Sequence, residues 1–337
     1  MVDILEALKK NPFVLAPMAG ITDPPFRSFM RELSCSMVVT ELISANGLKF
    51  NSEKTRRMMA FEEIQRPVGI QLFGETPDIV ADAARQAEQM GADFVDLNFG
   101  CPVKKVVCKG AGSAMLKDLP RMAEMLRQVK SAIRIPLTIK VRTGWDDGSR
   151  NALEVARLAH DEGITWVAIH GRTRAAGYSG LADWDYIAQV KAQSPLPILG
   201  NGDVTSAQLA VERLRQSGCD GILIGRGCLK NPLIFKQALN LWNQNSDSEI
   251  VDFVPLLEKL YQHLCKFYDD HVIKIQMRKF AGWYSAGYPN SSTFRKSLYA
   301  NDELAQIKAI IFEYFGEARN FLQKDTSDEA FLMGGHG

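Results

Sequence analysis

The sequence predicts a (β/α)8 TIM barrel followed by a C-terminal all-helical domain, and two features of the chain favour this fold class. Short apolar runs recur eight times in the first two thirds of the 337 residues, and several are nearly continuous in Val, Ile and Leu, which is typical of strands covered on both faces. Stretches with helical spacing separate these runs. A strand–helix unit repeated eight times over roughly 250 residues is the pattern of a barrel, whereas an open doubly wound sheet fits six strands better.

The predicted strands begin with FVLAPM and end with GILIGR. They occupy residues 13–18, 37–42, 68–73, 94–99, 136–141, 166–171, 197–202 and 221–226. Between them, residues 76–92 open with Thr-Pro, place apolar side chains at helical spacing and reach a glycine stop at Gly91. Residues 151–163 and 206–218 follow the same logic, and each ends in glycine, so both are predicted to be helices.

Beyond about residue 247 the strand signal disappears. Residues 255–271 carry leucines at helical spacing, and residues 302–315 repeat the pattern with Asp302 and Glu303 in a favourable first turn. We therefore predict a barrel at 1–244, a helical domain at 245–325 and a loose tail at 326–337.

Composition excludes several classes of protein. The formal net charge is only +1, which argues against a partner held by overall charge but allows local basic faces. Six cysteines without a CxxC pair, and five histidines without ligand spacing, predict reduced thiols and no metal site. The N-terminus lacks the apolar core of a secretory signal and no apolar run approaches ~18–20 residues, so we expect a soluble cytoplasmic protein without a membrane segment.

Polar or otherwise unusual residues stand where the predicted strands end. In a barrel these carboxyl ends gather at one rim, which carries the active site. The residues are Met18, Glu41, Gln71, Asn98, Cys101, Lys140, His170, Asn201, Asp203, Gly225 and Arg226. Each has an ordinary explanation alone, since Lys140 can snorkel to water and a single His170 is more often a core histidine. A whole rim of such residues predicts a site.

The segments GNGDV and GRGCLKNP follow the seventh and eighth predicted strands, where barrels commonly bind phosphate. Their glycines let backbone N–H groups approach an anion, and Arg226 adds charge-assisted hydrogen bonds, although tight turns alone also explain the glycines. Lys140 and Gln71 suit a planar electron-accepting ring, because a cation beside a flavin stabilises its reduced anion. No GxGxxG follows a strand, so a tightly held nicotinamide dinucleotide is not expected.

Beyond these rim residues, the sequence resembles the tRNA-dihydrouridine synthase family, in particular its bacterial B-type branch. The matching segments are APMAGITDPPFR, DLNFGCPVKKV, GAGSAML, KVRTGW, IHGRTR, GNGDVTS and IGRGCLKNPLIF, from about residue 13 to 236, with MRKFAGWYSAGYPNSSTFRKSL in the helical domain. The resemblance implies FMN-dependent reduction of the C5–C6 double bond of specific uridines in tRNA, with NADPH as the source of hydride. It also implies that the helical domain binds tRNA.

The same resemblance implies a role for individual residues. Cys101 is the implied general acid, which delivers a proton to C5 after hydride from flavin N5 has reached C6. His170 is expected against the flavin near the substrate. The other residues implied to bind FMN are Pro17, Met18 and Ala19 along the flavin, Gln71 and Lys140 at its ring, and Asn201, Gly202, Asp203, Gly225 and Arg226 at its phosphate end.

The basic loop after Cys101 predicts how RNA is held. An ordinary thiol pKa near ~8.5 leaves a cysteine protonated at neutral pH, but Lys104 and Lys105 beside it favour the thiolate. Either these lysines point toward phosphates or substrate binding neutralises them, and we favour the first. Asn98 is expected to hydrogen-bond the flipped base at a carbonyl or N–H. Phosphate contacts are expected from Lys104, Lys105, Arg142, Arg172 and Arg174.

Two other functions stay open from the sequence. One is an FMN-dependent TIM-barrel oxidoreductase acting on a small pyrimidine, which explains the flavin residues but neither the helical domain nor the rim arginines. The other is a non-catalytic RNA-binding protein, which leaves Cys101 without a role. The near-zero net charge and two-domain organisation predict a monomer. The helical domain also carries a set of basic residues that is either a second basic surface for RNA or a solvated helix face: Lys274, Arg278, Lys279, Arg295 and Lys296.

Overall fold

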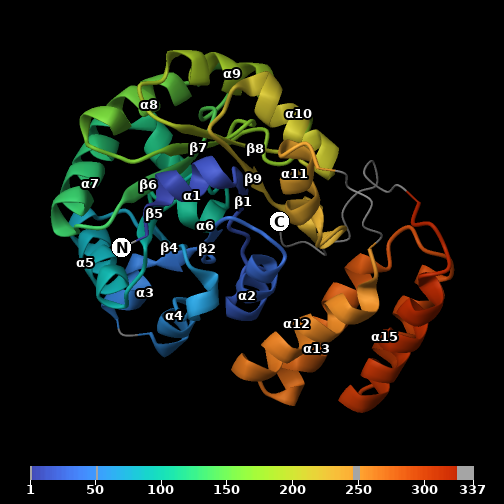
Figure 1. The fold of residues 1–337 in the computed structure, drawn as a ribbon. Helices are drawn as coiled ribbons and strands as arrows, with labels where there is room; N and C mark the ends of the chain where they lie inside the picture. The colour runs from blue at the N-terminus through green and yellow to red at the C-terminus, as the bar shows by residue number, and fades with distance from the viewer. Residues whose placement is uncertain (1, 51, 246–250, 325–337) are drawn as a thin grey trace.

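The computed structural model describes residues 2–50, 52–245 and 251–324, and its centre is a parallel β-barrel (Figure 1). The strands follow the order β1-β9-β8-β7-β6-β5-β4-β2, and β3 also pairs with β4. Leu15 N donates to Met37 O at 3.1 Å and Ser36 N donates to Phe13 O at 3.0 Å, so the chain leading into β2 also joins β1 and completes the ring. The predicted (β/α)8 barrel is confirmed.

The strands occupy eight positions around the barrel, because β2 and β3 share one. Their bounds are β1 Phe13–Leu15, β2 Val38–Val39, β3 Ile43–Ser44, β4 Val68–Phe73, β5 Phe94–Phe99, β6 Leu137–Arg142, β7 Val167–His170, β8 Ile198–Asn201 and β9 Gly221–Ile224. The sequence predicts one strand at 37–42, whereas the structure interrupts it at Thr40. There the Thr40 hydroxyl accepts the Gln71 N–H at 3.0 Å, in place of a backbone carbonyl.

Helices surround the barrel and cover its outer face (Figure 1). Those of the barrel part are α1 Ile4–Lys10, α2 Pro24–Glu32, α3 Ala45–Lys49, α4 Glu53–Met58, α5 Pro77–Gln89, α6 Lys104–Val107, α7 Leu119–Ala132, α8 Ala152–Asp161, α9 Trp184–Gln193, α10 Ala207–Ser217 and α11 Ile234–Trp242. Short 3-10 helices are η1 Glu63–Gln65, η2 Gly112–Lys117, η3 Asp147–Ser149 and η4 Arg226–Leu229. The helices predicted at 76–92, 151–163 and 206–218 correspond to α5, α8 and α10.

Side chains inside the barrel alternate with side chains that face the helices, because successive residues of a strand point to opposite faces. On β5, Val95 and Leu97 belong to the outer layer and Phe94 to the inner one, so Asp96 and Asn98 also point inward. At the N-terminal end the inward side chains are apolar, and α1 lies across this end in Figure 1. At the carboxyl end they are polar, which places the rim residues around one mouth.

The C-terminal helices lie at the side of the barrel in Figure 1, with bounds α12 Phe253–Phe267, α13 Asp270–Tyr284, α14 Ser291–Ala300 and α15 Leu304–Ala318. The predicted helix at 255–271 ends early, because Asp269 caps α13. The domain bounds 1–244 and 245–325 stay a prediction, and the tail at 326–337 lies outside the described residues. None of the helices in the described ranges combines the length and apolarity that a membrane crossing requires.

Helices α12 and α13 dock against α2 and the turn that precedes it. The Phe280 ring stacks on the Phe26 ring with centroids 5.0 Å apart. The Tyr268 hydroxyl donates to Asp23 Oδ2 at 2.9 Å. Burial raises the pKa of Asp23, which the Lys279 charge and the hydrogen bonds to the carboxylate only partly counter. These contacts form a joint, partly apolar and partly charged, between the helical part and the barrel.

Candidate functional site

The parallel register places the polar rim residues side by side. Opposite pairs in neighbouring strands are Gln71 with Asp96, Asn98 with Lys140, Arg142 with His170, and His170 with Asn201. Because each of these residues points into the barrel, strands β4 to β8 contribute to one polar surface at the mouth. The structure thus brings together the residues that the sequence predicts at the strand ends.

A chain of hydrogen bonds runs from the barrel interior to Cys101. Asp96 accepts from Thr138 Oγ1 at 2.7 Å and from Gln71 Nε2 at 2.7 Å. Gln71 Oε1 accepts from Asn98 Nδ2 at 2.9 Å. Asn98 Oδ1 accepts the backbone N–H of Cys101 at 2.8 Å. The position of the cysteine therefore depends on a buried carboxylate two side chains away.

Lys140 carries a positive charge into the mouth. Only through-space charge interactions with Arg142, Asp96 and Cys101 act on its ammonium, and no hydrogen bond or ion pair joins it to the described residues. Burial lowers the pKa of Lys140 to about 8 and the Arg142 charge lowers it too, whereas Asp96 and Cys101 have the opposite effect. A cation in this setting is suited to bind a ligand that carries or acquires negative charge.

Cys101 lies half-buried where the chain leaves β5. Burial raises the pKa of its thiol, and the Val103 N–H and the charges of Arg142 and Lys140 only partly counter this. Lys104 and Lys105 are exposed on α6 and are not among the groups that shift it. The thiol is therefore protonated at neutral pH, so neighbouring lysines in the sequence do not conflict with a role as proton donor.

A glycine allows the loop after Cys101 to return against it. Gly112 has a φ of 59°, and a Cβ there would lie 3.0 Å from Cys101 O. Ser113 Oγ donates to the same carbonyl oxygen at 2.9 Å. Because a larger residue at 112 would collide with this carbonyl, the glycine keeps the loop close to the cysteine.

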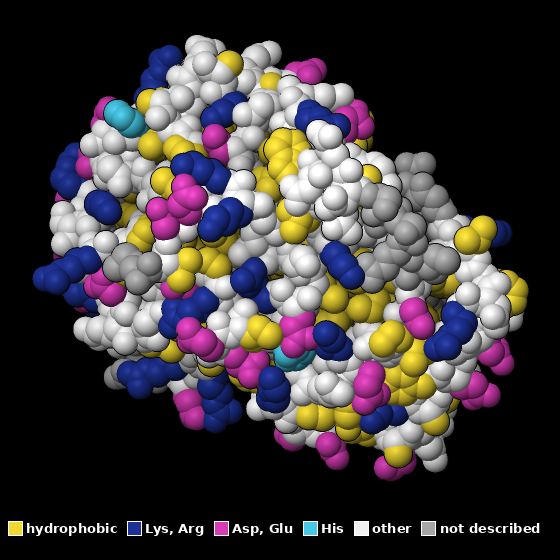
Figure 2. Space-filling model, in the orientation of Figure 1, with side chains coloured by type: hydrophobic (Ala, Val, Ile, Leu, Met, Phe, Trp, Pro, Cys, Tyr) yellow, Lys and Arg dark blue, Asp and Glu magenta, His cyan; other side chains and the backbone are white. Residues whose placement is uncertain are grey.

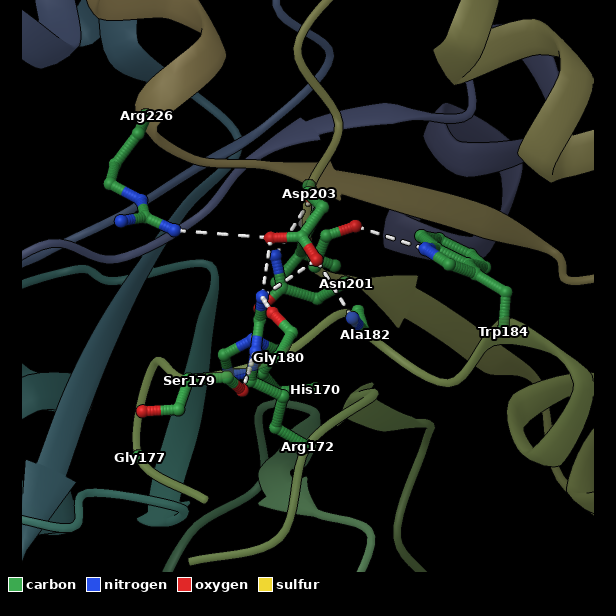
Figure 3. A network of polar contacts seen from close by, with 12 residues as sticks. His170, Arg172, Gly177, Ser179, Gly180, Ala182, Trp184, Asn201, Asp203 and Arg226 are labelled. Carbon is green, nitrogen blue, oxygen red and sulfur yellow. Dashed lines mark hydrogen bonds and ion pairs between the residues drawn. The ribbon is translucent and has the colours of Figure 1, made fainter. Parts of the chain in front are cut away.

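An ion pair fixes the loop between β7 and α9 beside the mouth (Figure 3). Arg172 Nη2 donates to both Asp203 oxygens, at 2.9 and 2.7 Å, and Ala182 N donates to the same carboxylate at 2.7 Å. Arg172 also donates to Ser179 O at 3.1 Å and Gly180 O at 2.6 Å. Because the Arg172 side chain is only 4% exposed, the pair organises this loop from inside.

His170 is buried at the end of β7. Burial lowers its pKa well below the ordinary value, and the charges of Lys140, Arg142, Arg172 and Arg226 lower it further. His170 Nε2 lies 3.3 Å from Arg172 Nη1, which can only donate. The imidazole is therefore neutral, accepts at Nε2 and carries its proton at Nδ1.

Sequence reasoning missed Tyr178, which is 47% exposed in the loop between β7 and α9. The guanidinium carbons of Arg142 and Arg226 lie 5.6 and 5.2 Å from the centre of its ring, and the His170 ring centre lies 6.4 Å away. A single aromatic residue in a glycine-rich loop has no periodic signal. Only the folded loop shows that Tyr178 lies at the site.

The turns after β8 and β9 are suited to an anion. Asn201 Nδ2 donates to a β9 carbonyl at 2.9 Å, which ties the two strand ends together. Gly202 has a φ of 128°, and a Cβ there would lie 2.5 Å from a neighbouring side chain, so only glycine fits. Four backbone N–H groups donate to no acceptor in the described part of the chain: those of Gly202, Asp203, Gly225 and Arg226. Such groups beside the partly exposed Arg226 side chain match phosphate.

The turn after β1 borders these groups. Pro17 and Met18 are half-buried and Ala19 is exposed. A Cβ at Gly225 would lie 3.6 Å from Met18 Sδ, so the methionine lies beside the turn after β9. The next residue, Gly20, donates its N–H to the Glu41 carboxylate. The three residues predicted to line a flavin therefore lie at the same mouth as the turns after β8 and β9.

The cationic residues predicted to bind RNA fall into two groups. Lys104 and Lys105 are exposed, and the Arg174 guanidinium lies 4.4 Å from the centre of the Trp145 ring. Arg142 and Arg172 are 2% and 5% exposed and donate to backbone carbonyls. These two hold loops together and reach only groups that enter the mouth, so the structure does not place them with the exposed lysines.

Basic residues of the helical part also have partners within the protein. Lys274 and Arg278 contact Asp302 at 2.9 and 3.4 Å, and Lys279 Nζ donates to Gly20 O at 2.9 Å. On the face drawn in Figure 2, Lys and Arg are interspersed with Asp and Glu and form no continuous basic area. The described residues contain no group of three or more His, Cys, Asp or Glu side chains that could hold a metal ion.

Asp96 also escaped the sequence reasoning, although a signal for it existed. In FVDLNF it stands two residues before Asn98, so both point to the same face of a mostly apolar strand. A carboxylate inside a barrel is costly unless it has partners, so an aspartate in such a strand predicts that the fold supplies them. Its partner Thr138 carries no such signal.

Comparison with known proteins extends this picture to almost the whole chain. The family model described as "Dihydrouridine synthase (Dus)" matches residues 14–317. The tRNA-dihydrouridine synthase B of Pseudomonas aeruginosa is 36% identical over 313 residues, which cover 92% of this chain and 94% of that protein. The probable tRNA-dihydrouridine synthase of Rickettsia conorii is 37% identical over 307 residues, which cover 90% and 92%.

Among solved structures, the fold is similar to that of histamine dehydrogenase from Rhizobium sp. 4-9, with a TM-score of 0.54 and 15% identity over 75% of this chain. This chain spans 49% of that structure, so the likeness concerns the barrel fold alone. The family match and the relatives, in contrast, cover both the barrel and the helices beside it. The chain therefore belongs to the dihydrouridine synthase family, whose members are tRNA-modifying oxidoreductases.

Proposed function

We propose that this protein reduces the C5–C6 double bond of specific uridines in tRNA, with bound FMN and with NADPH as reductant. The observation that carries the proposal is a protonated thiol, Cys101, at a barrel mouth beside Asn98 and the cation Lys140. Such a thiol can donate a proton to a substrate that accepts hydride. The relatives' names, which are those of tRNA-dihydrouridine synthases, support uridine in tRNA as that substrate.

The residues of the mouth fit FMN. Lys140 suits the ring, and Gln71 keeps one Nε2 hydrogen beyond its bond to Asp96. When bound, FMN supplies the hydride that C6 of the uracil accepts. The terminal phosphate is suited to the free N–H groups of Gly202, Asp203, Gly225 and Arg226, with Asn201 between the two turns and with Pro17, Met18, Ala19 and His170 along the ring system.

Cys101 supplies the proton. Hydride at C6 leaves negative charge at C5 and O4 of the base, and transfer of the Sγ proton to C5 completes the reduction. The uracil thereby gains one hydride and one proton. The remaining thiolate is favoured by the charges of Arg142 and Lys140 and regains its proton from solvent.

Asn98 retains one donor for the base. Its Oδ1 accepts the N–H groups of Gly100 and Cys101 at 3.1 and 2.8 Å, and one Nδ2 hydrogen goes to Gln71. The second Nδ2 hydrogen can donate to a carbonyl of the uracil. We therefore propose a contact with a carbonyl, because the oxygen that an imide N–H would need already accepts two hydrogen bonds.

The proposed phosphate contacts are Lys104 and Lys105, which are exposed, and Arg174, which is half-buried against the Trp145 ring. Arg142 and Arg172 are proposed to act only within the mouth and its loops, because both are buried. We also propose that the helical residues 245–325 dock tRNA next to the barrel at 1–244. The target base must leave its stack to reach the mouth, which costs a few kcal/mol. A cytoplasmic, monomeric enzyme fits this proposal.

The test uses the purified protein with FMN, NADPH and tRNA that lacks dihydrouridine, and maps dihydrouridine position by position. We expect the wild type to modify one position or one cluster. Cys101→Ala should lower the rate about 100-fold or more while the bound flavin absorbance stays, because only the proton donor is lost. Cys108→Ala, which changes the exposed cysteine of the same loop, should keep the wild-type rate.

Free uridine and uracil complete the experiment. Reduction of either one as fast as tRNA would support the alternative, an oxidoreductase acting on a small pyrimidine. A protein that purifies without flavin and binds none would overturn the proposal and favour a non-catalytic RNA-binding function.

A further inference from the structure

Asp96 is a buried carboxylate at the mouth to which the proposed function gives no role. It is 4% exposed and lies on β5 opposite Thr138. Its two oxygens accept from Thr138 Oγ1 and Gln71 Nε2, each at 2.7 Å. These bonds satisfy the oxygens but leave a full negative charge inside the barrel, and such a charge is costly without a cation.

The cation nearest to Asp96 in the strand register is Lys140, which lies opposite Asn98. Lys140 follows Thr138 by two residues on β6, so both side chains point inward, one layer apart. Burial lowers the pKa of Lys140 to about 8, the Arg142 charge lowers it too, and Asp96 is the carboxylate that acts in the opposite direction. Burial in turn raises the pKa of Asp96, and the Lys140 charge acts against this rise. Each group favours the charged form of the other.

Other ionisable groups around Lys140 do not replace Asp96. Arg142 on the same strand repels it, and His170 on β7 is neutral because its own pKa is lowered by burial and by cations. The Cys101 thiol is protonated, since burial raises its pKa. Asp203 is already paired with a buried arginine. Within the described ranges, Asp96 is therefore the source of negative charge for Lys140.

We propose that Asp96 is a positioning residue for Lys140: its carboxylate is the counter-charge that keeps the ammonium protonated in the barrel mouth. The role of this pair in the reaction rests on the proposed function, in which a protonated Lys140 stabilises the negative charge of the reduced cofactor. The inference also explains why a buried carboxylate stands at the base of the hydrogen-bond chain that leads to Cys101.

Asp96→Asn tests the charge with little change of shape. Asparagine can accept from Gln71 with Oδ1 and donate to Thr138 with Nδ2, so the chain to Cys101 survives. In FMN-free protein, competitive acetylation followed by mass spectrometry gives the pKa of Lys140. We expect that pKa to fall from about 8 by about one unit or more in D96N. Thr138→Val is the matched control, because it removes a hydrogen bond to Asp96 but no charge, and should leave the pKa of Lys140 unchanged.

The pH profile of the FMN-loaded protein provides a second readout. Reduction of bound flavin by NADPH should become slower as the pH rises through the pKa of Lys140, because the stabilising cation is lost. D96N should move this decline to lower pH by the same amount, and T138V should not move it. A purely structural role for Asp96 would slow both variants without moving the decline, and would overturn the inference.

An unchanged Lys140 pKa in folded D96N would also overturn it. Lys140→Met keeps the inference testable if D96N does not fold. Without the ammonium, the folded-state pKa of Asp96 rises further above its unfolded value, so K140M should lose stability relative to wild type as the pH rises from about 4 to 7. A constant difference in melting temperature over that range would contradict the pairing. These measurements need no tRNA, so the inference can fail while the proposed reaction holds, and the reverse.

Discussion

At the residue scale, burial decides the protonation of the groups at the mouth. Removal from water disfavours charge, so the pKa of the Cys101 thiol is raised while those of Lys140 and His170 are lowered. The mouth therefore combines a protonated thiol, a neutral imidazole and an ammonium whose charge is sensitive to pH. Proton donation requires this arrangement: a donor that keeps its proton at neutral pH, with cations near enough to favour its conjugate base.

Alkylation by iodoacetamide should reveal the raised pKa of Cys101, because only the thiolate reacts. We expect the rate constant of Cys101 to rise with pH around a midpoint above the ordinary value of ~8.5. Peptide mass spectrometry of a pH series measures this rate, and the exposed Cys108 in the same digest controls for the reagent. A midpoint at or below the ordinary value would contradict a protonated acid.

At the element scale, the turn after β8 holds the loop that follows β7. Asp203, which follows β8, pairs with Arg172, which follows β7, and Arg172 binds two carbonyls of its own loop. Arg142 at the end of β6 donates to Gly177 O at 2.7 Å in the same loop. Three neighbouring strand ends thereby position Tyr178 beside the mouth.

Asp203→Asn should loosen this loop. The loss of a charge-assisted pair with a buried arginine is expected to lower the free energy of unfolding by about 2 kcal/mol. Asp147→Asn is the matched control, because the Asp147 side chain is 80% exposed in its pair with Arg150 and should contribute close to nothing. Urea unfolding measures both variants, and hydrogen exchange at 177–182 reports the loop. Equal effects of the two substitutions would contradict this role of Asp203.

At the scale of the whole molecule, the helical part is joined to the mouth of the barrel. Asp23 accepts the Phe26 N–H as the cap of α2, and accepts from Tyr268 and Gln276 of the helical part at 2.9 and 3.4 Å. Lys279 binds the carbonyl of Gly20, one residue after the segment proposed to line the flavin. A movement of the helices would therefore directly reach the side of the mouth that is proposed to line the flavin.

Asp23→Ala should destabilise the protein more than Asp3→Ala. Each aspartate caps a helix, and loss of a cap alone costs about 1 kcal/mol. Asp23→Ala also leaves the Tyr268 and Gln276 donors without their acceptor, which adds about 1–3 kcal/mol. Denaturant unfolding of the two variants measures the difference. Equal losses would show that the joint contributes nothing beyond the cap.

The barrel could be predicted from the sequence because its signals are local. Strands covered on both faces are continuous apolar runs, and helices such as α10 end at glycine, here Gly218 with a φ of 65°. The rim followed from a general property of parallel strands, whose carboxyl ends meet at one edge. Cys101, Lys140 and His170 were therefore predicted to share a site, and the structure places all three at the mouth.

The sequence by itself thus determined the fold class, the family resemblance and the set of residues at the mouth, and the tertiary structure decided how these residues are used. In the folded protein, Arg142 and Arg172 bind backbone carbonyls of the loops, and Lys279 donates to Gly20 O. Tyr178 lies at the site, and Asp96 accepts from Gln71 and Thr138. The physical reason is that a side chain's partner and its pKa depend on burial by elements distant along the chain. Local spacing states which face a residue occupies, but only packing determines what that face meets.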